Sequence, residues 1–502
     1  MRIRPSLWLS TIPSAFQHVE MLEERREGHV EGRRELAHGC GTRSEAAPPT
    51  ARCVAFECAS ARFHARLTSG VSNRIRIALR ALRHRNLRLF FVGQGVSLVG
   101  TWMQQVAMSW LVYRLTDSAL LLGVIGFSSQ FPSLVMAPFA GALADRWSRY
   151  RMVVVAQTLA MLQAVVLAIL VITNLVEVWH LVGLALVVGT INGVDIPARQ
   201  ALLVKLVEGQ DLPNAIALNS SMFNAARLVG PALGGVLIGI WGEGLVFVLN
   251  AASYVAVLGA LAMIRLPRGR GAPAGDILAQ IRAGFRYSFG FPPIRDLILV
   301  LAALSLLGIP YVVLFPVFAR DILGGDAMTL GVLTGSSGAG ALIGALYLAS
   351  RDTVRGLGKV IVRSAALFGF TLIVFAASRN LLLSCAMLVV GGFGLMLTTA
   401  SINTVLQTLV GEEMRGRVMS LYTMAFMGMM PVGSLVGGAL ASRVGGPITV
   451  ALGGLGCLAL SLWFKTRIEP LRALVLPVYE ERGVLPEVAR GLGAVTELRP
   501  RA

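Results

Sequence analysis

Charged residues are scarce in this chain of 502 residues. They make up 14% of it, whereas an ordinary soluble domain carries about 25%. Apolar residues reach 55%, which argues against the several soluble domains that the length alone would suggest. Apolar runs of about 20 residues recur between Leu89 and Phe464, each long enough to cross a hydrocarbon core about 30 Å thick. Because backbone groups find no water in that core, these runs are predicted to be helices.

The sequence also lacks the short motifs of enzymes and nucleotide-binding proteins. It contains no P-loop and no nucleophile elbow, so neither catalysis nor ATP-driven pumping by this chain alone is expected. No cofactor and no metal is expected either. Cys40, Cys53 and Cys58 lie near His38 and His64, but their spacing matches no structural zinc site.

The apolar runs define twelve predicted transmembrane spans and the segments that flank them. The spans cover approximately 89–113, 119–143, 152–173, 178–200, 215–240, 244–264, 295–319, 328–350, 358–377, 380–405, 416–440 and 445–464. The predicted domains are a tail at 1–70, a basic amphipathic segment at 71–88, a six-helix bundle at 89–264, a linker at 265–294, a second bundle at 295–464 and a tail at 465–502.

The two segments before the first span differ in character. Residues 1–70 show no helical or strand periodicity, so they are expected to be disordered, or to be absent if translation starts at Val71. Residues 71–88 place apolar side chains among many arginines. This pattern predicts a segment on the anionic lipids of the cytoplasmic face.

Acidic residues are the minority charge, 27 against 45 basic ones, and the formal net charge is +18. Nucleic acid is not an expected partner, because the basic residues gather in the tails and in short loops without interleaved aromatics. They are concentrated after the even-numbered spans. The opposite loops contain only Arg114, Arg320, Arg379 and Arg443. Positive residues stay inside, so both termini are predicted to be cytoplasmic, which fits an even number of crossings.

An internal repeat relates the two halves. The matches are Ser97–Gly100 with Ser305–Gly308, Leu122–Val124 with Leu330–Val332 and Ser128–Ser129 with Ser336–Ser337, all at offset 208, then Leu206–Val207 with Leu409–Val410 and Gly234–Gly235 with Gly437–Gly438, at offset 203. The offset spans six helices, so both halves have the same orientation. The prediction is an all-α polytopic membrane protein with two pseudo-symmetric six-helix bundles around a cavity, as in transporters with parallel repeats.

The loop after the second span reads GALADRWSRYR and starts at Gly141. It resembles the major facilitator signature G-x-x-x-D-R-x-x-R-[KR]. Gly141, Asp145, Arg146 and Arg149 match, whereas Tyr150 stands where a basic residue is usual.

The resemblance implies that Asp145 faces the positive N-terminus of span eleven, which here begins near Arg415 and Arg417. Asp145 is also expected to pair with Arg199 at the end of span four. These charges are therefore predicted to gate the cytoplasmic side.

Span five contains the sequence RLVGPALGG, whose Gly230, Pro231, Gly234 and Gly235 match a GPxxGG core that resembles the signature of antiporter members. Proline removes a backbone donor and kinks a helix, and glycines let helices approach closely. An export signature and a plain helix kink both stay open, since a kink does not encode direction.

Arg227 falls near the middle of span five, where a charge costs from about 3 to more than 10 kcal/mol. It shares one helix face with Ser220 and Asn224, so it is expected to face protein or a water-filled cavity. Substrate contact and bracing of the kink both stay open as its role. Further polar stripes of the predicted cavity are Gln94, Ser97, Thr101 and Gln104 in span one, and Thr399, Asn403 and Gln407 in span ten.

Asp195 is the best acidic candidate for coupling transport to protons. It lies one turn before Arg199 and is predicted to pair with it, although it sits near the cytoplasmic end of span four. No acidic residue lies in the middle of the other spans, so protons stay an open candidate for the coupling ion. If packing separates Asp195 from Arg227, the arginine lacks a counter-ion, and an anionic or catechol-bearing substrate would supply one.

Five segments together, RALRHRNLRLFFVGQ, SLVGTWMQQVA, GALADR, DIPARQALL and LPNAIALNSS, resemble the enterobactin-exporter-like branch of the major facilitator superfamily, also called transmembrane secretion effectors. The resemblance covers roughly residues 75 to 465. It implies export of a siderophore-like, drug-like or other small molecule across a bacterial inner membrane by alternating access. A monomer is expected. A lipid or lysophospholipid flippase and a non-transporting membrane receptor or enzyme stay open as alternatives.

Overall fold

The computed structural model describes residues 80–481, apart from 147, 208, 265–276 and 352–355. Within these ranges the side chains of 137–146, 277–281 and 481 are left out of the description. The chain divides into two units, Met1–Arg76 and Ile77–Ala502, and every described residue belongs to the second. The predictions for the tail at 1–70 and for a start at Val71 therefore lie outside the described residues.

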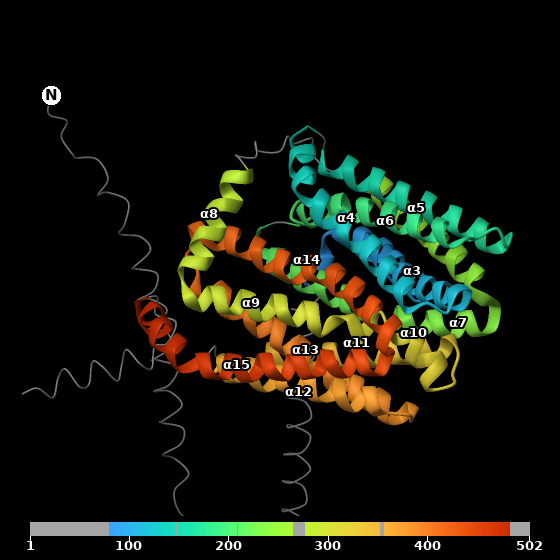
Figure 1. Cartoon of the computed structure of the whole chain (residues 1–502). Coiled ribbons are helices and arrows are strands. Elements are labelled where there is room, and N and C mark those ends of the chain that lie inside the picture. Colours follow the sequence, from blue (N-terminus) through green and yellow to red (C-terminus); the bar gives the residue numbers. More distant parts are fainter. Residues whose placement is uncertain (1–79, 147, 208, 265–276, 352–355, 482–502) are drawn as a thin grey trace, which may run out of the picture. The chain divides into compact units, whose positions relative to one another are not determined.

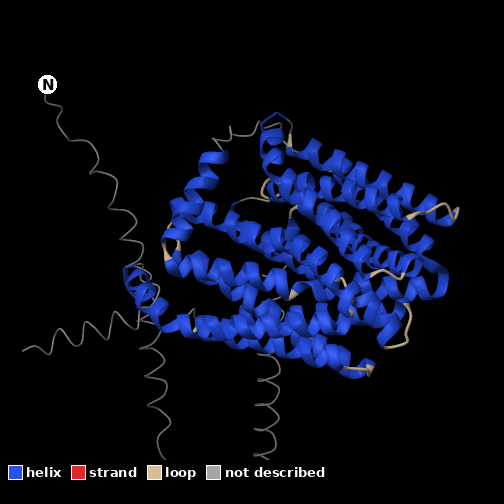
Figure 2. Ribbon diagram, viewed as in Figure 1, coloured by secondary structure: helices blue, strands red, loops and turns tan. Residues whose placement is uncertain are grey.

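The described part of the chain is helical and contains no strand, which confirms the predicted all-α fold (Figure 2). The first half contains η1 (Arg80–Arg83), α3 (Arg85–Thr116), α4 (Ala119–Arg146), α5 (Arg149–Ile172), α6 (Val178–Leu203), η2 (Gly209–Asp211) and α7 (Leu212–Met263). After α8 (Ile277–Gly290), the second half contains α9 (Pro292–Leu307), η3 (Ile309–Val312), α10 (Phe315–Val317), η4 (Phe318–Ile322), α11 (Ala327–Ala349), α12 (Leu357–Ala377), α13 (Leu381–Leu409), α14 (Glu412–Val444) and α15 (Gly446–Glu481).

Ten helical segments in the described part are long and apolar enough to cross a membrane. One of them contains all of α7, which bends at Gly242, where a φ of 79° interrupts the helix between predicted spans five and six. α3 is 32 residues long but is not among the ten. Counting both arms of α7 and adding α3 gives twelve segments, so the number of crossings stays a prediction.

The seventh predicted span lies within one apolar segment, Pro292–Ile322, that is long enough to cross a membrane, but this segment is not one continuous α-helix. α9 ends at Leu307, and the chain continues through a short 3-10 turn (η3) and a π-helical turn (η4). Pro310 has no amide hydrogen to donate, so one hydrogen bond of the α-helical ladder is missing at this point and a break there is favoured. Packing holds the broken part instead. The buried ring of Phe318 stacks on Phe375 of α12 at a centroid distance of 4.4 Å.

Helix α15 continues well beyond its predicted end at 464 and reaches Glu481. The extension packs back on its own half. Arg467 binds Asp296 of α9 at 3.0 Å, and the Tyr479 hydroxyl lies 3.0 Å from that of Thr408 in α13. The sequence beyond 464 is thus partly structured, where only a tail was expected.

The two halves use the same packing scheme, as the repeat predicts. In the first half α3 packs on α7, α4 on α6, and α5 on both α6 and α7. In the second half α9 packs on α14 and α15, α11 on α13, and α12 on both α13 and α15. The halves, blue to green and yellow to red in Figure 1, meet where α4 lies along α14 and α7 lies along α11.

The end of the bundles at which α3 begins is called the inner end below, and the end at which α3 finishes is the outer end. Near the outer end, glycines bring the halves into backbone contact. A Cβ on Gly123 of α4 would lie 2.6 Å from the carbonyl oxygen of Ser434 and 3.0 Å from the Cα of Gly438, both in α14. A Cβ on Gly235 of α7 would lie 2.9 Å from the Cα of Gly331 in α11. Gly123 and Gly331 occupy equivalent positions of the internal repeat, and so do Gly235 and Gly438. The contact between α4 and α14 is therefore the repeat equivalent of the contact between α11 and α7.

Candidate functional site

Asp195 lies inside the first bundle and is only 3% exposed. The predicted pair with Arg199 is present, with the guanidinium 3.5 Å from Oδ2. Gln157 of α5 donates a hydrogen bond of 3.0 Å to Oδ1. The carboxylate is therefore held between two helices, while its role in coupling stays a prediction.

Of the four polar residues predicted to line the cavity from span one, Thr101 and Gln104 form hydrogen bonds within their own bundle, whereas Gln94 Oε1 is buried without a hydrogen-bond partner among the described residues. Gln94, Ser97 and Gln104 are buried, and Thr101 is half-buried. Gln104 accepts a 2.7 Å hydrogen bond from Asn250 of α7 and donates one of 3.2 Å to Gln163 of α5. Their contact with a substrate stays a prediction.

Arg227 lies half-buried, midway along the first arm of α7. Its guanidinium carbon is 5.9 Å from the centroid of the Trp102 ring of α3, and that ring meets the edge of Phe223 at 5.8 Å. Asp195 is occupied by Arg199, and no carboxylate among the described side chains forms an ion pair with Arg227. Asp195 therefore does not serve as the counter-ion of Arg227. Under this condition the sequence predicts that an anionic substrate binds at Arg227.

The other predicted cavity residues interact mainly along their own helices. Asn224 donates to the Ser220 carbonyl at 2.8 Å, and Ser220 is exposed. Thr399 is buried and bonded to the backbone of its own turn, and the half-buried Asn403 accepts from Gln407. Ser220, Asn224 and Asn403 keep exposed surface, whereas Thr399 does not, and contact of any of them with substrate stays a prediction.

The GPxxGG segment packs α7 on two neighbours at once. A Cβ on Gly230 would lie 2.5 Å from the Cβ of Trp102, and one on Gly234 would lie 3.1 Å from the Cα of Met103, both in α3. Gly235 faces α11 on the other side. Pro231 lies buried between these glycines, and α7 stays helical through it. The physical use of the motif here is close packing both within and between bundles.

The gating motif is described only in part. The side chains of Gly141, Asp145 and Arg146 lie outside the described set, so their predicted contacts stay predictions. Arg149 lies half-buried in the first turn of α5. In the first two turns of α14, Arg415 is exposed and the half-buried Arg417 donates to the sulfur of Met414 at 3.3 Å.

At the outer end, polar side chains of the two halves meet in a cluster that sequence reasoning missed. The Tyr113 hydroxyl of α3 donates to Asp321 of η4, and Arg320 forms an ion pair with Asp117 at the end of α3. The Arg320 guanidinium also lies 5.9 Å from the centroid of the Tyr113 ring. A signal was available in the sequence. Tyr113 and Asp321 are 208 residues apart, which is the repeat offset, so equivalent positions meet near the pseudo-two-fold axis.

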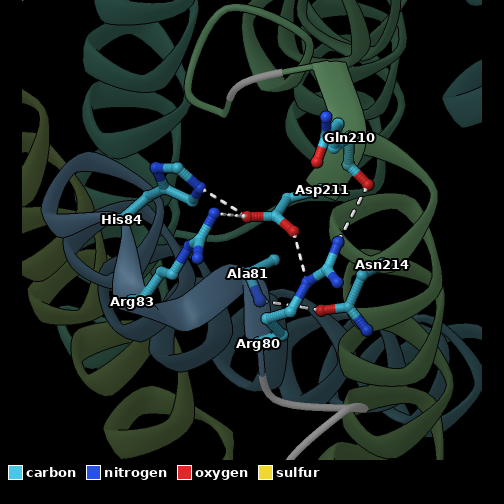
Figure 3. Close-up of polar contacts among 7 residues, drawn as sticks. All are labelled: Arg80, Ala81, Arg83, His84, Gln210, Asp211 and Asn214. Atoms are coloured by element: carbon cyan, nitrogen blue, oxygen red, sulfur yellow. Dashed lines mark hydrogen bonds and ion pairs between the residues drawn. The ribbon is translucent and has the colours of Figure 1, made fainter.

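At the inner end, one buried carboxylate holds the segment that precedes α3 (Figure 3). Asp211 has no exposed surface. Its carboxylate oxygens lie 2.6 Å from a side-chain nitrogen of Arg80, 2.9 Å from one of Arg83 and 2.8 Å from one of His84. The hydrogen bond from His84, aided by both arginines, lowers the pKa of the Asp211 carboxyl below its ordinary value. Two arginines of the predicted lipid-facing segment thus bind the protein itself.

Two bundles of matching topology, joined by α8 and closed on each other at one end, define a multi-pass membrane transporter. The chain belongs to the transmembrane secretion effector family of the major facilitator superfamily, whose model matches residues 77–478. The resemblance stated from the sequence is thereby confirmed.

Characterised relatives are distant but span most of the chain. The staphyloferrin A transporter of Staphylococcus aureus is 23% identical over 385 residues, which cover 75% of this chain and 95% of the relative. The multidrug efflux pump Tap of Mycolicibacterium fortuitum is 26% identical over 357 residues, covering 69% and 87%. These relatives are transporters, not enzymes.

Solved structures support the fold. A bacterial homologue of the iron transporter ferroportin in an inward-facing state matches with a TM-score of 0.60 at 17% identity, covering 76% of this chain and 98% of that one. A bacterial homologue of the lysosomal transporter Spinster, also inward-facing, matches with a TM-score of 0.58 at 14% identity, covering 79% and 97%. At these identities the likeness concerns the fold alone.

Proposed function

We propose that this protein exports a small molecule from the bacterial cytoplasm across the inner membrane by alternating access. The observation that carries the proposal is the doubled glycine contact that joins α4 to α14 and α7 to α11 near the outer end. Two pseudo-symmetric bundles that touch closely at one end are suited to rock about a central site and close at the other.

The relatives support the proposed direction of transport, and the loop charges support the proposed orientation of the chain in the membrane. The curated relatives include a staphyloferrin A transporter, a multidrug efflux pump and the macrolide efflux protein A of Streptococcus pyogenes. The excess of arginine in the loops of the inner end supports a cytoplasmic placement of that end and of both termini. In this orientation the outer contacts close the periplasmic side.

The substrate class that we propose is a small anion or a molecule with an anionic group. Arg227 is a permanent cation, and its one described close partner is the face of Trp102. An aromatic face stabilises a guanidinium by about 0.5–2 kcal/mol, which is less than a paired carboxylate in a site of low dielectric contributes. A substrate carboxylate or catecholate would supply the missing acceptor.

A strain lacking the gene tests the proposed function even while the substrate is unidentified. Small molecules in cells and medium are compared among the deletion strain, the strain complemented with the wild-type gene and the strain with an empty plasmid. At least one compound should accumulate inside the deletion strain and return to the medium on complementation. Identical distributions in all three strains would argue against export.

A further inference from the structure

Helix α8 connects the two bundles at the inner end of the molecule. It follows α7 in the chain and packs on α14. In Figure 1 α8 lies across the inner ends of α9 and α14, whereas those two helices run along the length of the bundle. Because the long helices cross the membrane, a helix that lies across their inner ends is placed along the surface of the cytoplasmic leaflet.

One face of α8 packs on the protein. Ser288 has no exposed surface, and a Cβ on Gly284 would lie 3.1 Å from the Cβ of Arg417 in α14. Gly284 and Ser288 are four residues apart, so they share one helix face. The missing side chain at Gly284 lets α8 lie close against α14.

The face of α8 that points away from α14 carries two arginines and two phenylalanines. Arg282 and Arg286 are both exposed and lie one turn apart, as do Phe285 and Phe289. Phe285 is 52% exposed, and its ring stacks on that of Phe289 at a centroid distance of 4.1 Å. With 3.6 residues per turn, the four side chains fall within an arc of about 100°. An apolar stripe and a cationic stripe therefore lie side by side.

The two arginines have no counter-ion among the described residues. The acids in the first turn of α14, Glu412 and Glu413, are exposed and form an ion pair with neither. Asp296, the buried acid of α9, is bound by two other arginines. A fitting partner for this surface is therefore anionic beside Arg282 and Arg286 and apolar beside the phenylalanines.

We propose that α8 is a membrane-surface helix that binds anionic phospholipids of the cytoplasmic leaflet. Phe285 and Phe289 enter the boundary between headgroups and acyl chains, and Arg282 and Arg286 bind the phosphate oxygens. A planar guanidinium matches two oxygens of one phosphate. The long arginine side chains can reach the headgroups while the rings stay at the depth of the first acyl carbons.

A phospholipid fits this surface better than a soluble anion. The chain is a multi-pass membrane transporter, so the inner leaflet adjoins α8 and supplies a phosphate and an apolar chain in one molecule. A free phosphate ion would match the arginines but would leave the stacked rings in water. The lipid is a bound partner and not the cargo, so the inference does not depend on the substrate or on the direction of transport.

This surface is distinct from the lipid contact that the sequence predicts at residues 71–88. Two arginines of that segment, Arg80 and Arg83, form ion pairs with Asp211. The arginines of α8 lie on the other side of the linker, next to the second bundle. Binding of α8 to the leaflet would hold the connection between the bundles at the membrane surface while the bundles move.

Fluorescence quenching by brominated lipids tests the proposal on the full chain. The five cysteines are replaced by alanine, and a fluorophore is attached at Phe289→Cys. The protein is reconstituted in phosphatidylcholine vesicles that contain equal fractions of either brominated phosphatidylglycerol or brominated phosphatidylcholine. Both lipids should quench the probe, and phosphatidylglycerol should do so at a lower fraction. A probe at Tyr287→Cys, about half a turn around the helix, should be quenched weakly.

The arginines should account for the preference for phosphatidylglycerol. Arg282→Gln and Arg286→Gln should each lower the relative affinity for phosphatidylglycerol about fivefold, the effect of one cation near an anionic leaflet. Lys205→Gln is the matched control, because Lys205 is an exposed cation that follows α6 at the inner end of the first bundle. It should leave the preference unchanged.

Three results would overturn the proposal. Equal quenching by the two lipids would show that the headgroup is not recognised, and an unchanged preference in both arginine variants would show that other groups recognise it. No quenching by either lipid would show that this face of α8 meets water or a soluble partner. If the label at Phe289 prevents accumulation in the membrane, a probe at Phe285→Cys takes its place.

Discussion

Arg227 is the residue whose energetics most constrain the mechanism. A charge at the middle of a span costs from about 3 to more than 10 kcal/mol, and stacking on an aromatic ring returns about 0.5–2 kcal/mol. Trp102 therefore offsets only part of the cost. The rest must come from water or from a bound anion, which makes the arginine informative about substrate charge.

Replacing Arg227 should change charge selectivity. Arg227→Gln should weaken transport of an anionic substrate about 10-fold to 100-fold, the loss of a charge-assisted hydrogen bond of about 1.5–3 kcal/mol, and should spare neutral and cationic substrates. Arg227→Lys should weaken this transport less, since lysine keeps the positive charge but lacks the planar guanidinium that binds an anion with two hydrogen bonds. Transport by each variant is compared for substrates of matched size and different charge.

Arg443→Gln is the control for this series, because Arg443 is exposed in the last turn of α14. Equal losses for substrates of every charge in Arg227→Gln would indicate that the arginine braces the kink and does not bind substrate.

Asp211→Asn should release the segment that precedes α3. A neutral amide cannot balance two arginines and a histidine, so trypsin should cleave after Arg80 and Arg83 faster than in wild type, as N-terminal sequencing of the products would show. Glu412→Gln, an exposed acid in the first turn of α14, should leave cleavage unchanged. Unchanged cleavage in Asp211→Asn would show that other contacts hold the segment.

The same site predicts a pH dependence. Because the pKa of Asp211 is lowered, its ionised form stabilises the docked segment at every pH above the ordinary carboxyl range. That stabilisation is lost only as the pH falls through the lowered value, below about 3.9. The segment should therefore stay docked throughout the neutral range.

Among single residues, the sequence revealed the contacts that are local. Asp195 and Arg199 are one helical turn apart, so their pairing follows from helix geometry. Asp211 and Arg80 are 131 residues apart, and nothing in the local sequence of either indicates the other. For this reason the inner cluster became visible only in the folded chain.

At the level of helices, apolar length located the spans but not their ends or their breaks. Twenty apolar residues look alike whether they form one helix or several short pieces, so the interruption at Pro310 was missed. The glycines of α7 were recognised as packing residues. Which helices they face depends on tertiary structure, and the answer is α3 on one side and α11 on the other.

Gly123→Ala should push the outer ends of the bundles apart. Its Cβ would lie 2.6 Å from the Ser434 carbonyl, closer than packed atoms approach, so the closed outer contact should become less populated. The measurement is pulsed EPR between spin labels at the exposed positions Leu175 and Leu382, which lie at the outer end of opposite halves. The distance distribution should shift to longer values.

Gly259→Ala is the matched control, because a Cβ on this helical glycine of α7 has nothing within 4 Å. Alanine also favours helix by about 1 kcal/mol over glycine, so any disruption from Gly123→Ala arises from the contact itself. An unchanged distance distribution for Gly123→Ala would contradict the account of the outer closure.

For the molecule as a whole, the prediction of two pseudo-symmetric bundles depends on the internal repeat. Matches six helices apart predicted halves in the same orientation, and the halves indeed share one packing scheme. The repeat contains no information about substrate, and single-sequence patterns say little about it. Arg227 indicates the charge of the substrate but does not identify the substrate.

Reporter fusions test the orientation of the whole molecule. A fusion after Arg286, in α8, should report the cytoplasm, and one near Glu243, at the bend of α7, should report the periplasm, because the arginine-rich loops stay inside. A fusion after Arg379, in the loop before α13, provides a second outer position and should agree with the one at Glu243. The reverse pattern would overturn the predicted topology.

Uptake into inside-out membrane vesicles tests the central claim most directly, namely that this protein exports a small molecule by secondary transport. The substrate is the compound retained by the deletion strain, and the ion gradient is set across the vesicle membrane. Vesicles with the wild-type protein should concentrate the compound beyond the level of empty vesicles, and collapse of the gradient by a protonophore should stop this. Equal uptake with and without the protein would contradict the account, as would uptake that survives collapse of the gradient and requires ATP.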